Sequence, residues 1–571
     1  MLAVSAAVMT LASCDLTLHP EDEVSPEYYF ENESDCLLWC NKFYSSILES
    51  PTMGSTTDLY MSNGISAYVS GNRNPATQSW SFSALRDINY LLEHLDQCKD
   101  KAVANKYEAV GRFFRAYFYF KLVRTYGDVP YYDHVLGSTD KDIYKGRDDR
   151  GYVMDKVLED FDFAIANLPG SWEKLNTRVT KWAALGYASR AALFEGTFRK
   201  YHGMKDAEKY LTACAEYGKA FIDGAPFSLY STGATPYRDL FSSVDAKTQE
   251  VVLCRHYDMQ FGVVHGLGNQ VSFSRSSLTR RFVNHYLMAD GTRFTDKLGW
   301  ETMFYTDEVK DRDPRLAQTV LCPGYVQVGA SAVTPCEFYS WTGYEPIKHV
   351  PAAERCVSSS DDTDWILLRA AEVYLNFAEA KAELGTLTQN DLDVSVNKIR
   401  ARAKMPSLNL TAANDSPDPY MIECYPNVDK GSNRGVILEI RRERTVELAL
   451  EEPERVWDMF RWAEAKQCLQ HFVPWYGVYI PALGAYDTTG DGKADVEFVK
   501  TSSGAVKIKV GTKMQDVVLS DGDSGYIVSY STTDYGYLWD DSRDYLWPIP
   551  AKERTLNPNL SQNEGYVDGI D

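Results

Sequence analysis

Positive charge is scarce in this 571-residue chain, which has 59 lysines and arginines against 80 aspartates and glutamates and a formal net charge of −21. A surface of that sign repels a polyanion, so the composition argues against nucleic acid as a partner. Charge is absent altogether from residues 1–13, which are small or apolar.

Long apolar runs are also missing. No segment after residue 13 has 18 consecutive apolar residues, so we expect no membrane-spanning helix there. Residues 1–13 are shorter than the ~20 residues that cross a bilayer and are typical of an export signal, although the usual basic start is absent. The signal is therefore predicted with its true beginning left open.

A lipidation motif follows that signal. Leu11, Ala12, Ser13 and Cys14 have the spacing of a bacterial lipobox, in which the cysteine becomes the acylated first residue. The sequence therefore predicts a lipid anchor at Cys14. A chance cysteine after a signal-like run is the alternative.

Catalytic and zinc-binding motifs are absent. The chain contains no H-E-x-x-H, G-x-S-x-G or G-x-x-x-x-G-K-[ST] pattern, and its 11 cysteines form no C-x-x-C pair. We therefore predict a protein that is not an enzyme and requires no cofactor. A glycosidase-like pair of carboxylates remains an alternative, because such pairs are defined in space and 80 acidic residues are available.

Helical periodicity is what the chain has in abundance. In residues 107–130 apolar side chains recur at three- and four-residue steps until Gly127 and Pro130 end the pattern. Similar helices of about 18 residues, separated by Gly and Pro, indicate stacked helix hairpins of the tetratricopeptide sort. The predicted helices lie in residues 150–170, 179–198, 206–222, 365–385, 391–406 and 434–467.

The remaining sequence is rich in Gly, Ser, Thr and Tyr. Residues 226–364 and 470–546 contain short apolar or alternating runs, such as 250–257 and 505–510, which predict brief strands and hairpins. We interpret both regions as insertions into one helical scaffold formed mainly by residues 36–225 and 365–470. The predicted organisation is thus a signal at 1–13, a lipidated linker at 14–35 and one domain at 36–571.

Six segments in this order resemble the SusD/RagB family of glycan-binding outer-membrane lipoproteins. After the lipobox an Asp-rich linker leads to a Ser-Pro and a Tyr-Phe, and the later helices carry a Tyr-Gly-Asp-Val-Pro exit and an Arg-Glu-rich run. Glu564 and Pro453 depart from the family pattern at local turns. The matching segments are 15–30, 111–130, 282–291 followed by 311–320, 367–406, 439–462 and 547–566.

The resemblance implies a mostly α fold, a superhelix of about four tetratricopeptide-like hairpins with loop-rich and β-hairpin insertions. It also implies a lipid-anchored protein on the cell surface of the outer membrane, which captures an oligosaccharide and delivers it to a TonB-dependent, SusC-like transporter. Peptide or glycoprotein-derived cargo is one alternative. A surface carbohydrate-active enzyme is another.

Two loops carry the candidate ligand-binding residues. A sugar needs flat aromatic faces for its apolar side and Asn or Arg groups for its hydroxyls. Such residues cluster in loops at 62–82 and 338–346, where no helix face accounts for them. Capping of the core is the alternative role for each ring. The candidates are Tyr68, Asn72, Arg73, Asn74, Trp80, Tyr339, Trp341 and Tyr344.

Residues 486–498 hold a candidate calcium loop. Asp487, Asp491 and Asp495 occupy positions 1, 5 and 9 of the calcium-loop template, but Phe498 stands where the bidentate acid belongs. A hairpin turn rich in Asp and Gly explains the pattern equally well.

The charged run from Arg441 to Glu447 resembles an anion site at first sight. Opposite charges three and four residues apart on a helix are usually mutual partners, so we predict a structural role for it.

Overall fold

The computed structural model describes residues 29–568, apart from 55, 63–66, 72, 173–174, 452–453, 472–474 and 530–538. The predicted signal, Cys14 and most of the predicted linker lie outside the described residues.

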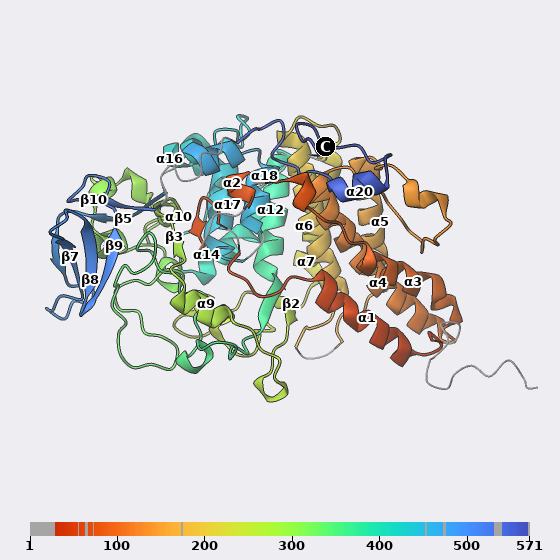
Figure 1. The fold of residues 1–571 in the computed structure, drawn as a ribbon, viewed down its shortest axis with the longest axis horizontal. Helices are drawn as coiled ribbons and strands as arrows, with labels where there is room; N and C mark the ends of the chain where they lie inside the picture. Colours follow the sequence, from red (N-terminus) through yellow and green to blue (C-terminus); the bar gives the residue numbers. More distant parts are fainter. Residues whose placement is uncertain are drawn as a thin grey trace, which may run out of the picture.

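Helices form the body of the molecule and pack in antiparallel neighbours (Figure 1). The helix α4 packs on α1, α3 and α5, α6 packs on α7, and α12 joins α7 to α17, so successive hairpins stack side by side. This confirms the predicted helical, tetratricopeptide-like class. The scaffold helices are α1 (Glu33–Ile47), α3 (Ser83–His94), α4 (Lys101–Tyr126), α5 (Arg150–Asn167), α6 (Lys181–Tyr201), α7 (Ala207–Gly224), α12 (Ala370–Glu383), α17 (Arg434–Glu447) and α18 (Glu454–Arg461).

Local signals explain the bounds of α4. The Asp100 carboxylate caps its start by accepting from the amides of Ala102 and Val103, and Gly127 ends it at a φ of +76°. Between these ends Phe113 and its apolar neighbours are buried. The 3.6-residue pattern read from the sequence is therefore the face that packs against the other helices.

One predicted helix begins with a strand instead. Residues 365–369 form β4 (Trp365–Arg369), which pairs antiparallel with β2 (Val251–Arg255), and α12 starts only at Ala370. The first four residues of β4 are apolar, and such a short run does not distinguish a buried strand from a helix by periodicity. The predicted helix at 391–406 is likewise split into α13 (Gln389–Asp393) and α14 (Val396–Arg402).

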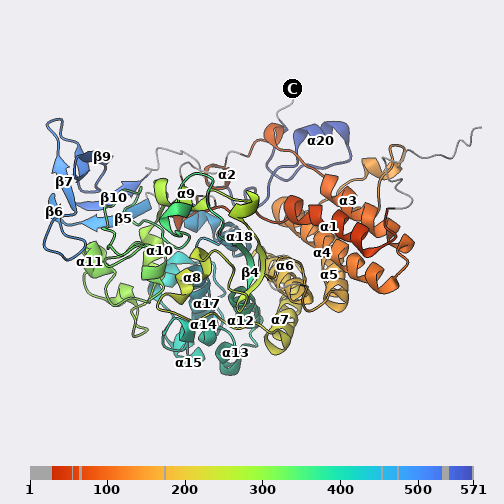
Figure 2. The ribbon, with the colours of Figure 1, turned by 90° about the horizontal axis from the view of Figure 1, so that it is seen from below.

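The strands of the 470–546 insertion lie at the end of the molecule opposite α3 to α5, and the 226–364 insertion extends from the middle of the molecule toward that end (Figures 1 and 2). The predicted hairpins at 470–546 form an antiparallel sheet of β6 (Gly484–Tyr486), β7 (Val496–Lys500), β8 (Val506–Val510) and β9 (Lys513–Val517), beside the pair β5 (Trp475–Ile480) and β10 (Gly525–Ser529). Short elements surround them: β1 (Tyr60–Met61), β3 (Ser277–Leu278), α9 (Leu267–Phe273), α10 (Arg280–His285), η7 (Trp300–Thr302) and α16 (Pro419–Cys424).

One continuous apolar core runs through scaffold and insertions alike, from Phe30 near the start to Leu560 near the end. The sequence-based division into segments stays a prediction. Within the described part of the chain, no helix combines the length and apolar character needed to cross a bilayer.

The charged run on α17 is structural, as predicted. Arg442 pairs with Glu439 on the same helix at 3.3 Å, but other partners of the run lie on other elements. Arg444 Nε bonds Asp458 Oδ2 on α18 at 2.8 Å, and Glu447 Oε1 accepts from Arg369 Nη1 at 2.6 Å. These side chains are buried, so the ion pairs tie α17 to α18 and β4 rather than decorating one exposed helix face.

Candidate functional site

An aromatic cavity of about 250 Å³ lies where α10, η7, α16, β5 and β10 meet. Elements far apart in sequence thus supply its wall. The lining side chains include Arg280 and Asn284 of α10, Trp300 of η7, Tyr420 and Glu423 of α16, Tyr476 of β5 and Tyr526 of β10.

The two strands place a pair of tyrosines at the cavity. The rings of Tyr476 and Tyr526 have centroids 4.8 Å apart at 38°, and Tyr476 keeps 39% of its surface exposed. Gly477 allows β5 to pack closely against the backbone at Thr342, because a Cβ at position 477 would lie 1.9 Å from the Thr342 carbonyl oxygen. The close approach fixes β5 and so fixes where Tyr476 points.

The opposite wall is built from Trp300 and Tyr420, whose ring centroids lie 6.0 Å apart in an edge arrangement. Arg280 joins the two walls: its Nη2 donates to the Trp300 carbonyl at 2.8 Å, and its guanidinium lies 4.9 Å from the Tyr526 ring centroid.

Arg280 stays charged in this position. Burial opposes its charge, but the nearby Glu308 carboxylate, at 3.1 Å, raises the pKa of Arg280 above its usual range. The rings are thereby held in place by a permanent cation.

Polar groups complement the rings. Asn284 Nδ2 donates to Tyr420 Oη at 3.3 Å, whereas its buried Oδ1 has no hydrogen-bond partner among the described residues. Glu423 is exposed at the rim. The cavity therefore offers flat apolar faces together with an amide acceptor and a carboxylate, which suits a ligand with an apolar face and a hydroxylated edge.

The predicted ligand residues of the first loop lie elsewhere. Trp80 is half-buried, with its ring against Phe82 and Tyr126 at centroid distances of 5.8 and 5.2 Å. Asn74 is exposed and caps a short turn by accepting from the Ala76 amide at 2.9 Å. Asn72 lies outside the described residues, as does the side chain of Tyr68.

Arg73 is enclosed. It is 3% exposed, bonds the Asp544 carbonyl, and lies 5.2 Å from the Trp539 ring centroid. A guanidinium surrounded in this way joins the loop to the carboxyl-terminal segment and has no free edge for a ligand.

The second predicted loop is divided between interior and surface. Tyr344 is fully buried and its hydroxyl donates to Glu308 at 2.8 Å, so its ring offers no face to a ligand. Tyr339 is 48% exposed. Trp341 is half-buried, and the Arg275 guanidinium covers its ring at 3.9 Å. None of the predicted ligand residues lines the aromatic cavity.

The side chains of the three aspartates in the candidate calcium loop accept hydrogen bonds from backbone amides of the same loop. Asp487 Oδ1 accepts from the Gly490 amide at 2.6 Å, and Asp495 Oδ2 accepts from the Thr488 amide at 2.7 Å. Asp491 caps the Lys493 amide at 2.9 Å. This is the hydrogen bonding of an Asp-rich turn, and calcium binding stays a prediction.

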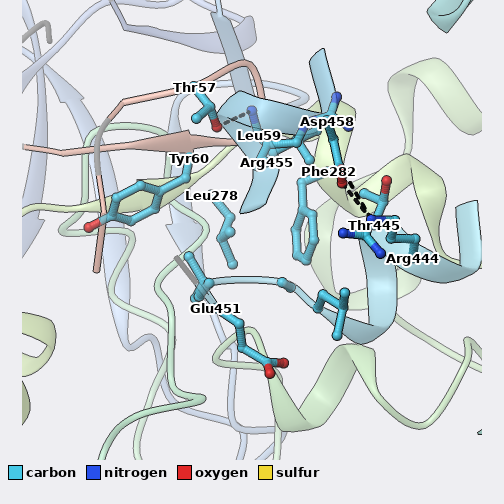
Figure 3. A pocket seen from close by; sticks show the side chains of 13 residues that line it. Thr57, Leu59, Tyr60, Leu278, Phe282, Arg444, Thr445, Glu451, Arg455 and Asp458 are labelled. Atoms are coloured by element: carbon cyan, nitrogen blue, oxygen red, sulfur yellow. Dashed lines mark hydrogen bonds and ion pairs between the residues drawn. The ribbon is translucent and has the colours of Figure 1, made fainter. Parts of the chain in front are cut away.

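A smaller cavity under β1 and α17 is a packing gap (Figure 3). Its volume of about 40 Å³ is little more than the ~30 Å³ share of one water. Two pairs of its lining residues bond each other: Arg444 to Asp458, and the Leu59 amide to Thr57 Oγ1 at 3.2 Å.

The rings of the aromatic cavity are not among the ligand-binding residues predicted from the sequence. The signal that was available is the exposed tyrosine within the Trp-Tyr-Gly-Val-Tyr run of β5 and the Trp after Gly299. Neither identifies a site alone, because the ring partner of Tyr476, Tyr526, is 50 residues away and that of Trp300, Tyr420, is 120 residues away.

Comparisons with known proteins all match SusD-like proteins. The profile of the SusD family matches residues 248–566, more than half of the chain. A second profile, described as starch-binding associating with outer membrane, matches residues 33–193. SusD-like protein P38 of Formosa agariphila is 22% identical over 513 residues, covering 82% of this chain and 92% of that protein.

Solved structures share the fold. A SusD-like carbohydrate binding protein from Bacteroides fragilis superposes with a TM-score of 0.65 at 19% identity, covering 93% of this chain and 100% of its own. A laminarin binding SusD-like protein superposes at 0.55 and 17%, covering 94% and 100%. A structure described as with xylogluco-oligosaccharide superposes at 0.57 and 17%, covering 96% and 99%.

Proposed function

Because the chain belongs to the SusD family, we propose that it is a cell-surface lipoprotein of the outer membrane that binds an oligosaccharide in the aromatic cavity. It then passes the bound glycan to a TonB-dependent transporter without changing a covalent bond. Peptide or glycoprotein-derived cargo is the alternative load for the same route.

The arrangement of Trp300, Tyr476 and Tyr526 around one cavity is the observation that carries this proposal. A pyranose stacks its apolar face on such rings while its hydroxyls meet Asn284 and Glu423. The glycans named for two structural neighbours, laminarin and a xylogluco-oligosaccharide, support a carbohydrate as the cargo.

Binding without hydrolysis is favoured by the carboxylates. Glycosidases use two carboxyl groups about the scissile bond. Among the described lining residues, Glu423 is the one carboxyl group. The nearby Glu308 is fully buried and ion-paired with Arg280 at 3.1 Å.

Truncation of the cavity rings tests the site. We expect Trp300→Ala and Tyr476→Ala each to weaken glycan binding by about thirtyfold, because removing an anchoring aromatic costs about 2 kcal/mol and 1.4 kcal/mol is a factor of ten. Affinity electrophoresis against laminarin, xyloglucan and starch, followed by titration calorimetry with the retained glycan, measures this change.

The matched control is Tyr152→Ala on α5, which removes a tyrosine of similar exposure, 47%, from the far end of the scaffold. Full affinity in both cavity variants would show that the glycan binds elsewhere. Product formation from a bound glycan, abolished by Glu423→Gln, would replace the binding role with an enzymatic one.

A further inference from the structure

A histidine and three aspartates gather in the connection between α4 and α5. The connection contains Asp133 and His134 and, further on, Asp140 and Asp142 at the start of the short helix η4 (Lys141–Tyr144). One side-chain ligand atom from each of His134, Asp140 and Asp142 lies within 4.8 Å of the other two. A nitrogen and two carboxylate oxygens that converge in this way are a donor set for a divalent metal ion.

The imidazole of His134 is oriented by the remaining aspartate. Its Nδ1 lies 3.0 Å from Asp133 Oδ1, and because an ionised carboxylate only accepts, Nδ1 carries the proton of this bond. The other nitrogen, Nε2, lies 3.6 Å from Asp140 Oδ2. Histidines that bind metals usually donate their second ring N–H to a carboxylate, which fixes the ring and leaves the other nitrogen as the ligand. Asp133 occupies this supporting position.

The spacing of the ligand atoms suits an ion better than a direct bond. The 3.6 Å from His134 Nε2 to Asp140 Oδ2 exceeds the ~2.7–3.2 Å of an N–H···O hydrogen bond. Two ligands that each lie ~2.1 Å from a tetrahedral zinc are about 3.4 Å from one another. Asp140 Oδ1 accepts from the Asp142 amide at 3.0 Å, so Oδ2 is the oxygen left to bind the ion.

The charge of the cluster favours a cation. Among the described residues, neither Asp140 nor Asp142 forms an ion pair with a lysine or an arginine. Lys145, on the same connection, pairs with Asp148 at 2.7 Å instead. Carboxylates held close together repel one another, and a divalent ion between them removes that repulsion.

The backbone on both sides of the cluster is held in place. Asn89 Nδ2 of α3 donates to the His134 carbonyl at 3.1 Å. On the other side, Asn559 Nδ2 of the carboxyl-terminal segment donates to the Tyr144 carbonyl of η4 at 2.7 Å. Ligands carried on a backbone that is fixed before binding lose little freedom when a metal ion arrives.

The mixed donor set selects among metal ions. Imidazole suits zinc and the neighbouring transition metals, whereas calcium and magnesium take oxygen ligands. The side chain of His134 is 42% exposed and that of Asp140 is 31% exposed, so water has access to complete the coordination.

We propose that His134, Asp140 and Asp142 bind one divalent transition-metal ion such as zinc, with Asp133 holding the imidazole and water in the remaining position. The ion joins segment 131–136 to η4 and so fastens the connection between α4 and α5. This connection packs on α3, at the end of the molecule opposite β5 and β10, so the metal site is independent of the aromatic cavity (Figures 1 and 2).

Titration calorimetry of the whole, untagged chain with zinc chloride tests the proposal. The wild-type protein is expected to bind one zinc ion with micromolar or tighter affinity near neutral pH, reversibly on addition of a chelator. Asp133→Ala is expected to weaken the binding by about ten- to a hundredfold, the usual cost of losing a supporting carboxylate.

Substitution of the ligands themselves is expected to cost more. His134→Gln and Asp140→Asn should each weaken zinc binding by at least about a hundredfold, beyond the loss in Asp133→Ala. Asn at position 140 keeps an oxygen to accept from the Asp142 amide and presents an amide NH₂ where the ligand oxygen stood, so the turn is retained while the ligand is lost. Circular dichroism in chelator confirms that each variant is folded, and a variant that is not is judged by the other two.

The matched control is His256→Gln. His256 belongs with Asp245 and Asp364 to another cluster of this kind among the described residues. There both oxygens of the buried Asp364 are already engaged, Oδ1 by His256 Nδ1 at 2.8 Å and Oδ2 by the Ala246 amide at 2.9 Å. His256→Gln is therefore expected to leave zinc binding unchanged.

Several outcomes would overturn the proposal. Zinc binding that persists unchanged in His134→Gln, or that is lost in His256→Gln instead, would place the ion elsewhere. Displacement of zinc by an equal concentration of calcium would contradict a site built on imidazole. Absence of zinc binding by the wild-type chain would remove the site.

Discussion

Buried ion pairs are the residue-scale feature on which the scaffold depends. Arg461 Nη2 bonds Glu379 Oε2 at 2.8 Å, and Trp462 Nε1 donates to Glu379 Oε1 at 2.7 Å, so α12 and α18 meet through one carboxylate. Burial alone would raise the pKa of Glu379, but the Arg461 charge outweighs it and lowers that pKa to about 2.

Glu379→Gln is therefore expected to lower the free energy of unfolding at pH 7 by about 3 kcal/mol, because it leaves buried arginine charge uncompensated. A carboxyl with a depressed pKa contributes stability above its unfolded pKa of 4.5 and loses it as pH falls toward 2. The gap between variant and wild type should thus narrow between about pH 4.5 and 2.

Urea denaturation at pH 7 and pH 3 measures that gap. The control is Glu354→Gln, whose carboxylate is 71% exposed in its pair with Arg355 and should change stability by less than about 1 kcal/mol. A gap of equal size at both pH values would contradict the assigned role of Glu379.

At the scale of elements, turns and strands decide how the insertions present their side chains. The turn between β6 and β7 closes on itself, since Asp487 accepts the Gly490 and Gly492 amides at 2.6 and 2.8 Å. These hydrogen bonds from Gly492 and Gly490 lower the pKa of Asp487. The turn is complete in its own hydrogen bonds, which bears directly on the predicted calcium site.

We accordingly expect removal of calcium by a chelator to leave the melting temperature unchanged, and Asp487→Ala to lower it slightly by freeing the turn amides. Differential scanning calorimetry with added calcium or chelator measures both effects. A calcium-dependent rise in melting temperature that Asp487→Ala abolishes would establish the metal site instead.

At the scale of the whole molecule, the described chain begins at one end and the aromatic cavity lies toward the other. The α1 end carries the start of the chain, whereas β5, β10 and α10 lie at the opposite end (Figures 1 and 2).

Cys14→Ala is expected to move the protein from the outer-membrane fraction to the soluble fraction of cells while leaving glycan affinity unchanged, because stable anchoring requires the acyl chains. Fractionation, with incorporation of a labelled fatty acid in the wild type, measures the change. Equal membrane association of both proteins would remove the proposed anchor.

Most of the scaffold follows from local signals. The bounds of α5, α6 and α7 lie within three residues of the predicted helices, and α4 begins six residues earlier than predicted. Caps, Gly stops and a 3.6-residue apolar pattern are encoded within each segment. The strand β4 was not predicted, because its hydrogen-bonding partner, β2, lies more than 100 residues away in the sequence. The burial of Arg73 and Tyr344 could not be predicted from the sequence for the same reason, because each side chain is enclosed by residues from other segments.

The amino-acid order by itself determined the helical class, the family and an acidic protein without recognisable catalytic motifs. Only the tertiary structure decided which rings face a cavity, because Trp300, Tyr476 and Tyr526 are brought together by long-range packing that no local period records. It also decided that the hydroxyls of Tyr325 and Ser340 are buried with no hydrogen-bond partner among the described residues, since burial is a property of the folded chain.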